Sequence, residues 1–169
     1  MANTYQLIEG KTLSSAVASV TFSSIPQTYA HLQLFMSTRA TQNVGREQIF
    51  ISPNASTTNN ARIVGFGYDN ALVASGTGTD RLFCWQPGNS TTANTFSNIS
   101  AHFLNYTSSN YKLYGGESVA ENNSSTSWII NINDTLWSDT SAITSIKIDC
   151  ETSTFAVNST FYLYGIKNS

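Results

Sequence analysis

The stretch HLQLFMSTRA, residues 31–40, decides the fold class of this chain. Its apolar residues recur at every second position, at Leu32, Leu34 and Met36. A period of two is the pattern of a β-strand that buries one face and exposes the other. The sequence therefore predicts a strand here, with its even-numbered side chains in a core.

Similar runs follow one another on both sides of this stretch, separated by short turns rich in Ser, Thr, Asn and Gly. The runs that predict strands are residues 5–11, 19–25, 31–40, 48–52, 61–68, 81–86, 95–106, 111–119, 128–132, 146–150 and 160–167. Helical periodicity is hard to find, and no repeat or linker divides the chain. We therefore predict an all-β fold, a jelly-roll-like two-sheet β-sandwich, as a single domain over residues 1–169.

The final run, FYLYGIKNS at residues 161–169, keeps apolar and aromatic residues almost to its end. Terminal segments are usually polar and poorly ordered unless they are tied into the fold. We therefore expect the last strand to be a central, paired strand of the sandwich.

The composition excludes several classes of function. Only 11% of the residues are charged, the formal net charge is −2, and the polar residues are mainly 24 Ser, 21 Thr and 17 Asn. Without a basic cluster, direct binding to nucleic acid is not expected. There is no apolar stretch of membrane-spanning length, and MANTYQLIEG does not read as a secretory signal, so we expect no membrane partner.

The sequence lacks the common catalytic motifs. No G-x-S-x-G elbow, P-loop or zinc-spaced Cys/His cluster occurs. The two histidines, His31 and His102, lie in strand-like runs, where a polar strand-face residue is the favoured interpretation over a general base. We expect no cofactor and no metal.

The carboxylates are sparse. Asp134 and Asp139 flank Trp137 in NDTLWSD, and a pair of acids could serve a glycosidase if they faced one another across a cleft. The segment is predicted to be a turn, in which acids usually bind their own backbone. Glu117 and Glu121 are isolated, and the sequence therefore predicts that the protein is not an enzyme and has no catalytic residues.

Aromatic residues raise a second possibility, a platform on which sugars stack. Trp85 and Trp128 lie in alternating strands and are predicted to pack in the core, while Trp137 is the best exposed candidate, although packing is favoured there too. Residues 74–80 are the most flexible-looking loop, and residues 121–127 are a second polar loop. Both loops could carry hydrogen-bonding groups for a glycan.

Two cysteines, Cys84 and Cys150, do not make a disulfide framework. Both lie in strand-like runs and are predicted to be buried thiols. A single bridge between them stays open, because spacing alone does not place their Cα atoms.

Several segments resemble small structural proteins of tailed bacteriophages, many of them aquatic. They are residues 1–34, with the YQLI and TFSSIP strands, residues 91–100 (TTANTFSNIS), residues 137–148 (WSDTSAITSIKI) and the final FYLYGIKNS. The resemblance covers most of the chain except residues 55–87. It implies a virion protein with an all-β, jelly-roll-like fold, and it brings no catalytic residues.

The leading hypothesis from this resemblance is a capsid decoration, or cement, protein that bridges neighbouring capsomers. Its expected partners are copies of itself, as a homotrimer, and the major capsid protein, and its expected location is the capsid surface after synthesis in the host cytoplasm. A neutral surface suits dense packing of many copies. The alternative is a tail fibre or receptor-binding protein that recognises host-surface glycans, and copy number in the particle separates the two.

Overall fold

The computed structural model describes residues 4–68, 71–120 and 129–167. In these ranges the regular structure is entirely β, with twelve strands in two antiparallel sheets. The strands are β1 (Tyr5–Thr12), β2 (Ser19–Phe22), β3 (His31–Ser37), β4 (Arg46–Pro53), β5 (Asn60–Tyr68), β6 (Ala71–Gly78), β7 (Leu82–Pro87), β8 (Asn98–Phe103), β9 (Lys112–Ala120), β10 (Ile129–Trp137), β11 (Ile146–Cys150) and β12 (Thr160–Ile166). The predicted all-β sandwich is confirmed.

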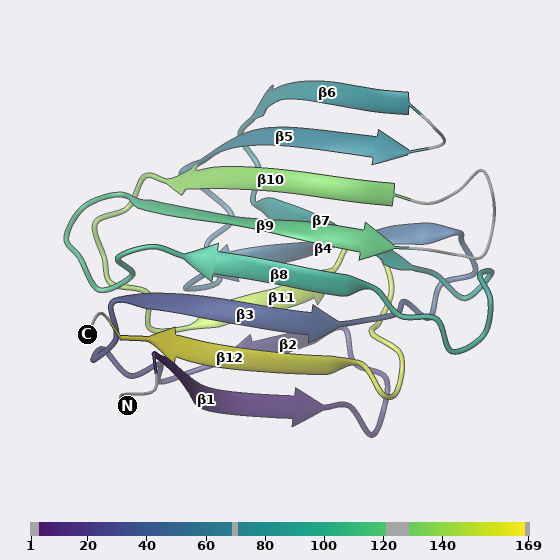
Figure 1. Cartoon of the computed structure of the whole chain (residues 1–169), viewed down its shortest axis with the longest axis horizontal. Helices are drawn as coiled ribbons and strands as arrows, with labels where there is room; N and C mark the ends of the chain where they lie inside the picture. Colours follow the sequence, from purple (N-terminus) through teal and green to yellow (C-terminus); the bar gives the residue numbers. More distant parts are fainter. Residues whose placement is uncertain (1–3, 69–70, 121–128, 168–169) are drawn as a thin grey trace.

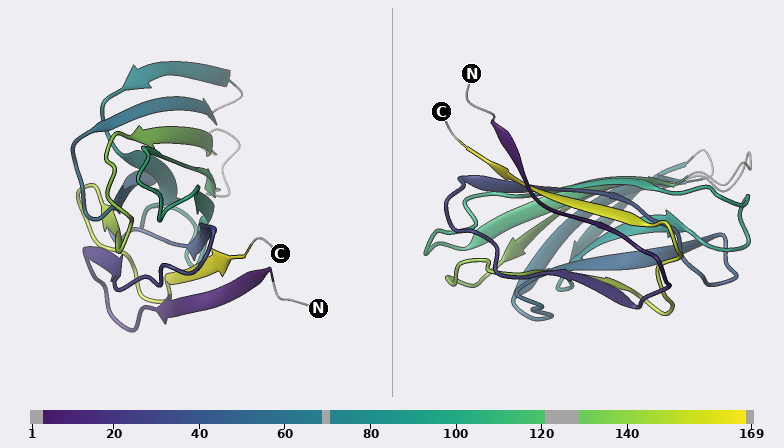
Figure 2. Two further views of the ribbon diagram at one scale, coloured as in Figure 1. Left: turned by 90° about the vertical axis from the view of Figure 1, so that its left-hand side faces the viewer. Right: turned by 90° about the horizontal axis from the view of Figure 1, so that it is seen from below.

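Eight of the strands form a jelly-roll frame. Strands β1-β12-β3-β8 lie in one sheet and β2-β11-β4-β7 in the other, and the chain crosses repeatedly between the two. Because of these crossings, neighbouring strands within each sheet come from distant parts of the sequence, as in a jelly roll. Figure 2 shows the two layers edge-on, with the smaller sheet on one side of the larger.

Two inserted hairpins extend the larger sheet beyond this frame. The hairpins β5–β6 and β9–β10 pair with one another through β10 and β5, so the full order is β1-β12-β3-β8-β9-β10-β5-β6 (Figure 1). We call β9, β10, β5 and β6 the extension. Strand β7 packs beneath β9 and β10, while β6 forms the far edge of the sheet.

The core lies between the two sheets and has two parts. The main part is made largely by the inward faces of the frame strands, with fully buried residues such as Leu34, Ile148 and Phe161, and by Phe155 from the segment between β11 and β12. A smaller cluster of Phe50, Val64 and Phe83, with Phe66 and Trp85 packed against it, joins the extension to β4 and β7. The extension is therefore fixed to the frame by its own apolar contacts as well as by backbone pairing.

Strand β12 is paired on both sides, as its sequence predicts, and lies second from the edge of the larger sheet. It pairs with β1 on one side and β3 on the other, and Phe161 and Leu163 are fully buried.

The expectation of a flexible loop at residues 74–80 is wrong for most of that stretch. Residues 71–78 form β6, because β5 offers them a row of backbone partners, from Tyr68 opposite Ala71 to Arg62 opposite Gly78. Their Gly, Ser and Thr content hid the strand.

Candidate functional site

The candidate site lies on the outer face of the eight-stranded sheet, where the frame meets the extension. Strand β8 projects His102 from this face, and β10 projects Asp134, with Gly115 of β9 directly between them in register. Two pairs further along, and so on the same face, Ser100 and Glu117 are opposite each other. Three ionisable side chains from three strands are thereby gathered on one surface, which faces the viewer in Figure 1.

Gly115 makes the approach of these side chains possible. A Cβ atom at this position would lie 1.8 Å from Asp134 Oδ1, which is far inside van der Waals contact. The carboxylate therefore lies across the space that a side chain on β9 would fill. This brings Asp134 Oδ1 to 3.7 Å from His102 Nε2.

The hollow around this pair measures about 230 Å³ and is lined by Ser100, His102, Gly116, Glu117, Ile132 and Asp134. The 3.7 Å separation exceeds hydrogen-bond length, so the pair is an ion pair only when the imidazole is protonated. Because both side chains are well exposed, that pair contributes little to stability. The arrangement suits recognition of a hydrogen-bonding or cationic group better than a nucleophilic relay, since within the described residues the one hydrogen bond of the Ser100 hydroxyl is a long bond accepted from Gln33, at 3.5 Å.

Asp134 and Asp139, the two acids predicted to share a turn, lie in different parts of the fold. The turn prediction is wrong for Asp134, which lies inside β10, because that strand continues to Trp137 opposite β5 and β9. It is confirmed for Asp139, whose Oδ1 accepts the Ser141 backbone N–H at 2.7 Å. This hydrogen bond holds the pKa of the Asp139 carboxyl below its usual value.

Glu117 is not isolated, contrary to the sequence-based expectation, because cross-strand pairing places it beside Ser100 in the same hollow as Asp134. Glu121 lies outside the described residues. His31 is a strand-face residue, as expected, and its Nδ1 accepts the Asn105 backbone N–H at 3.0 Å. His102 is also on a strand face, but no sequence signal linked it to Asp134, which is 32 positions away.

The tryptophans do not form a surface platform in the described residues. Trp137 is only 2% exposed, and the Lys112 ammonium lies 5.8 Å from the centre of its ring. Its identification as the best exposed candidate is therefore wrong, and the favoured alternative, that this ring is packed in the interior, is confirmed. Trp85 packs against the smaller core cluster, as predicted. Trp128 and the loop at residues 121–127 lie outside the described residues.

A group of exposed aliphatic side chains covers the extension next to the ionisable hollow. We call it the aliphatic patch, and its members are Ile63, Leu113, Val119, Ile130 and Ile132. Ile63 and Ile132 are 68% and 59% exposed, and Val119 and Ile130 are direct cross-strand neighbours. Asp134 and Glu117 lie among these side chains, opposite Ile63 and Ile132. A group of exposed apolar side chains on one sheet face commonly marks a site of protein contact.

The cysteines are free and buried, as predicted. Burial raises the pKa of the Cys84 thiol and of the Cys150 thiol to about 12 in each case. Both thiols lie on inward faces, where Gln86 donates a hydrogen bond to Cys150 Sγ at 3.3 Å. They are structural side chains of the interior rather than part of the surface site.

Comparison with known proteins does not place the chain in a family. No protein-family model and no curated protein matches its sequence. The fold and the surface therefore define a class, a jelly-roll β-sandwich with an extended outer sheet, and nothing narrower. Within the described ranges, no helix has the length and apolarity needed to cross a membrane, and no cluster of three or more His, Cys, Asp or Glu side chains could hold a metal ion.

Proposed function

We propose that this protein is a structural component of a tailed-bacteriophage virion and acts as a capsid decoration protein. The observation that carries the proposal is the aliphatic patch, a sheet face with exposed isoleucine, leucine and valine side chains in a chain of only 11% charged residues. Such a face is costly to leave in water and favours burial against other protein. The resemblance of both ends of the chain to phage structural proteins supports the same assignment.

The mechanism is mechanical rather than chemical. Copies of the chain associate as a homotrimer, and each trimer bridges neighbouring copies of the major capsid protein on the outside of the head. Individually modest contacts reinforce one another when one trimer touches several capsomers at once. A surface solvated by Ser, Thr and Asn, rather than by like charges, allows many copies to sit close together.

The rigidity of the sandwich supports this mechanism. Contacts between the strands are mostly long-range in sequence, and β12 locks the two ends of the chain into one sheet through its pairing with β1 and β3. An element that reinforces a shell has to resist deformation, which a close-packed two-sheet core does.

The copy number in purified virions tests the proposal. Quantitative mass spectrometry should give hundreds of copies per particle, close to one per major capsid subunit. In solution, light scattering should give three times the 18.4 kDa mass of one chain. A few copies per particle would contradict the capsid assignment and favour a tail fibre or receptor-binding protein.

A further inference from the structure

A second hollow lies on the outer face of the frame and borders the aliphatic patch where Asn98 pairs with Val119. It measures about 430 Å³ and opens between β3, β12 and the segment that leads into β8. We call it the aromatic hollow, and its lining includes Phe35, Phe96 and Tyr162 together with Ser37, Asn98 and Thr160. No local sequence pattern links these residues, because they come from three separate parts of the chain.

Two of the aromatic rings are presented by neighbouring strands. Phe35 and Tyr162 are cross-strand partners and remain 42% and 37% exposed. The Tyr162 ring lies against Gly10 of β1, where a Cβ atom would come within 2.8 Å of its Cδ1 and Cε1 atoms. The Phe35 ring meets Tyr164 edge-on, with centroids 5.9 Å apart. Each ring is thus supported by a neighbour and still open to solvent.

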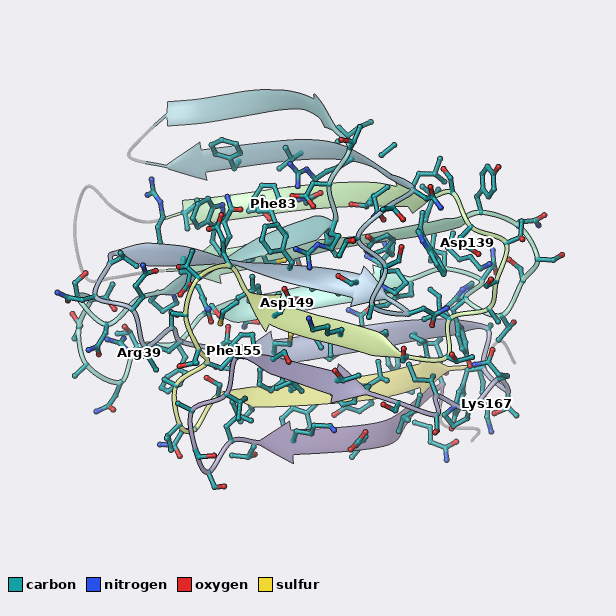
Figure 3. The ribbon with its side chains drawn as sticks, turned by 180° about the vertical axis from the view of Figure 1, so that it is seen from behind. Arg39, Phe83, Asp139, Asp149, Phe155 and Lys167 are labelled. Carbon is teal, nitrogen blue, oxygen red and sulfur yellow. The ribbon has the colours of Figure 1, made fainter. Side chains whose placement is uncertain are left out.

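The third ring, Phe96, belongs to a segment that is fastened on both sides. The Arg39 guanidinium donates to the Thr95 carbonyl oxygen at 2.9 Å, and the Ser97 hydroxyl donates to the Thr38 carbonyl oxygen at 3.0 Å. Arg39 is buried and lies at one end of the sandwich (Figure 3). The wall of the hollow is therefore fixed before a ligand arrives, which lowers the entropic cost of binding.

Three polar side chains of the aromatic hollow are uncharged and have no hydrogen-bond partner within the described residues. The side chains of Ser37, Asn98 and Thr160 make no hydrogen bond to any other part of the chain that the structure describes, and no charged residue lines the hollow. A third hollow, lined by Asn98, Ser100, Glu117 and Val119, continues from it, so hydrogen-bonding groups extend across the face toward β9.

We propose that the aromatic hollow binds a neutral oligosaccharide. Sugar rings present C–H faces that stack on exposed aromatic rings and hydroxyls that bond to amide and hydroxyl side chains. A nucleic acid would require cations for its phosphates, and none lines the hollow. A lipid chain would leave Ser37, Asn98 and Thr160 facing it without hydrogen-bond partners, which is unfavourable.

This inference does not rest on the capsid proposal. The aromatic hollow belongs to the frame and the aliphatic patch to the extension, so one face can contact protein through one half and a glycan through the other. Sugar binding would give the virion a weak hold on a polysaccharide-coated surface, whether the protein sits on the head or on the tail. Many weak sites of this kind reinforce one another on one particle.

The test is titration of the purified full-length protein with four neutral hexasaccharides: cellohexaose, maltohexaose, chitohexaose and mannohexaose. Chemical-shift changes in NMR spectra should concentrate on Phe35, Phe96 and Tyr162, with a Kd of about 0.1–1 mM for at least one sugar. The copy-number experiment is independent, so failure of one proposal leaves the other standing.

Four substitutions locate the site. Tyr162→Ala and Phe35→Ala should weaken binding at least about tenfold, while Asn98→Ala and Thr160→Val should weaken it less and leave the fold unchanged. Tyr111→Ala is the matched control, because Tyr111 is 59% exposed but lies in the turn before β9. It should bind like the unmodified protein.

Three results would overturn the inference. The first is no chemical-shift change with any of the four sugars at about 10 mM. The second is unchanged affinity in the folded Asn98→Ala and Thr160→Val variants together with unchanged affinity in whichever aromatic variant folds. The third is a set of shifts centred on His102 and Asp134 instead of the aromatic hollow.

Discussion

At the scale of the residue, asparagine does more than solvate the surface. Asn54 adopts a positive φ of 48°, in the left-handed region. Its Oδ1 atom accepts the backbone N–H groups of Thr144 and Ser145 at 2.9 and 3.1 Å, and its Nδ2 donates to the Ala142 carbonyl oxygen at 2.9 Å. One side chain therefore ties the end of β4 to the segment that precedes β11.

Replacing Asn54 by Ala should lower the free energy of unfolding by about 2–4 kcal/mol, because alanine is strained at positive φ and four side-chain hydrogen bonds are lost, the fourth being a long one from Thr144 Oγ1 at 3.4 Å. The matched control is Asn158→Ala. Asn158 has a φ of 69°, and within the described residues its side chain makes no hydrogen bond, so only the backbone cost of about 1 kcal/mol should remain. Urea unfolding measures both, and equal losses would refute the role assigned to the Asn54 side chain.

The two thiols should be inert in the folded protein. With the pKa of each raised to about 12, Cys84 and Cys150 carry very little thiolate at pH 8, and both are buried. Alkylation by iodoacetamide at pH 8 should be at least about a hundredfold slower in buffer than in urea. The native rate should rise only as the pH approaches 12, and fast labelling of either thiol at pH 8 would contradict this expectation.

At the scale of the element, the match of β9 to β10 depends on a glycine. Gly115→Ala places a methyl group where the Asp134 carboxylate lies, so the carboxylate must move away from His102. We expect a loss of about 1–3 kcal/mol of unfolding free energy from this overpacking.

A double-mutant cycle identifies the source of that loss. In an Asp134→Ala background the clash with the carboxylate is gone, and the tight contact with the Asn133 carbonyl oxygen at 3.0 Å remains. Gly115→Ala should therefore cost clearly less than it does alone, and the two substitutions should be non-additive by at least about 0.5 kcal/mol. Additive effects would show that the cost comes from the backbone of β9 instead. The cycle needs only urea unfolding of the three variants and the unmodified chain.

At the scale of the whole molecule, the outer face of the large sheet divides into halves of different chemistry. The extension carries the aliphatic patch, with Glu117 and Asp134 among its members, and the frame carries the aromatic hollow. His102 lies on β8, at the edge of the frame. The opposite sheet has a different character, since its outer face includes the Arg81–Asp149 ion pair at 3.1 Å. The larger sheet is therefore the face through which we expect association.

Ile132→Glu tests that expectation. A carboxylate in the centre of the aliphatic patch, beside Glu117 and Asp134, should abolish self-association and binding to capsids that lack this protein, because a charge would have to be buried unpaired. Val157→Glu is the matched control, since Val157 is 45% exposed and lies outside the patch. Loss of binding in both variants, or in neither, would rule out the patch as the contact.

The strands could largely be predicted from the sequence, whereas the candidate site could not. Every run predicted as a strand within the described residues overlaps a strand of the structure, because the alternation of apolar and polar residues is a local property of the sequence. Strand β6 was missed, since small residues give no alternating signal and pairing with β5 alone defines it. Trp137 was misplaced because β10 extends farther than its apolar run and turns that ring inward.

By itself the sequence determined the fold class, a single β-sandwich, together with the pairing of the last strand into the sheet and the burial of both cysteines. The tertiary structure alone decided which strands are neighbours, and with that the meeting of His102 and Asp134 over Gly115 and of Phe35, Tyr162 and Phe96 in one hollow. The physical reason is that side-chain direction along a strand follows from local geometry, with period two. Cross-strand register, in contrast, is set by pairing between segments far apart in the chain, which no local pattern records.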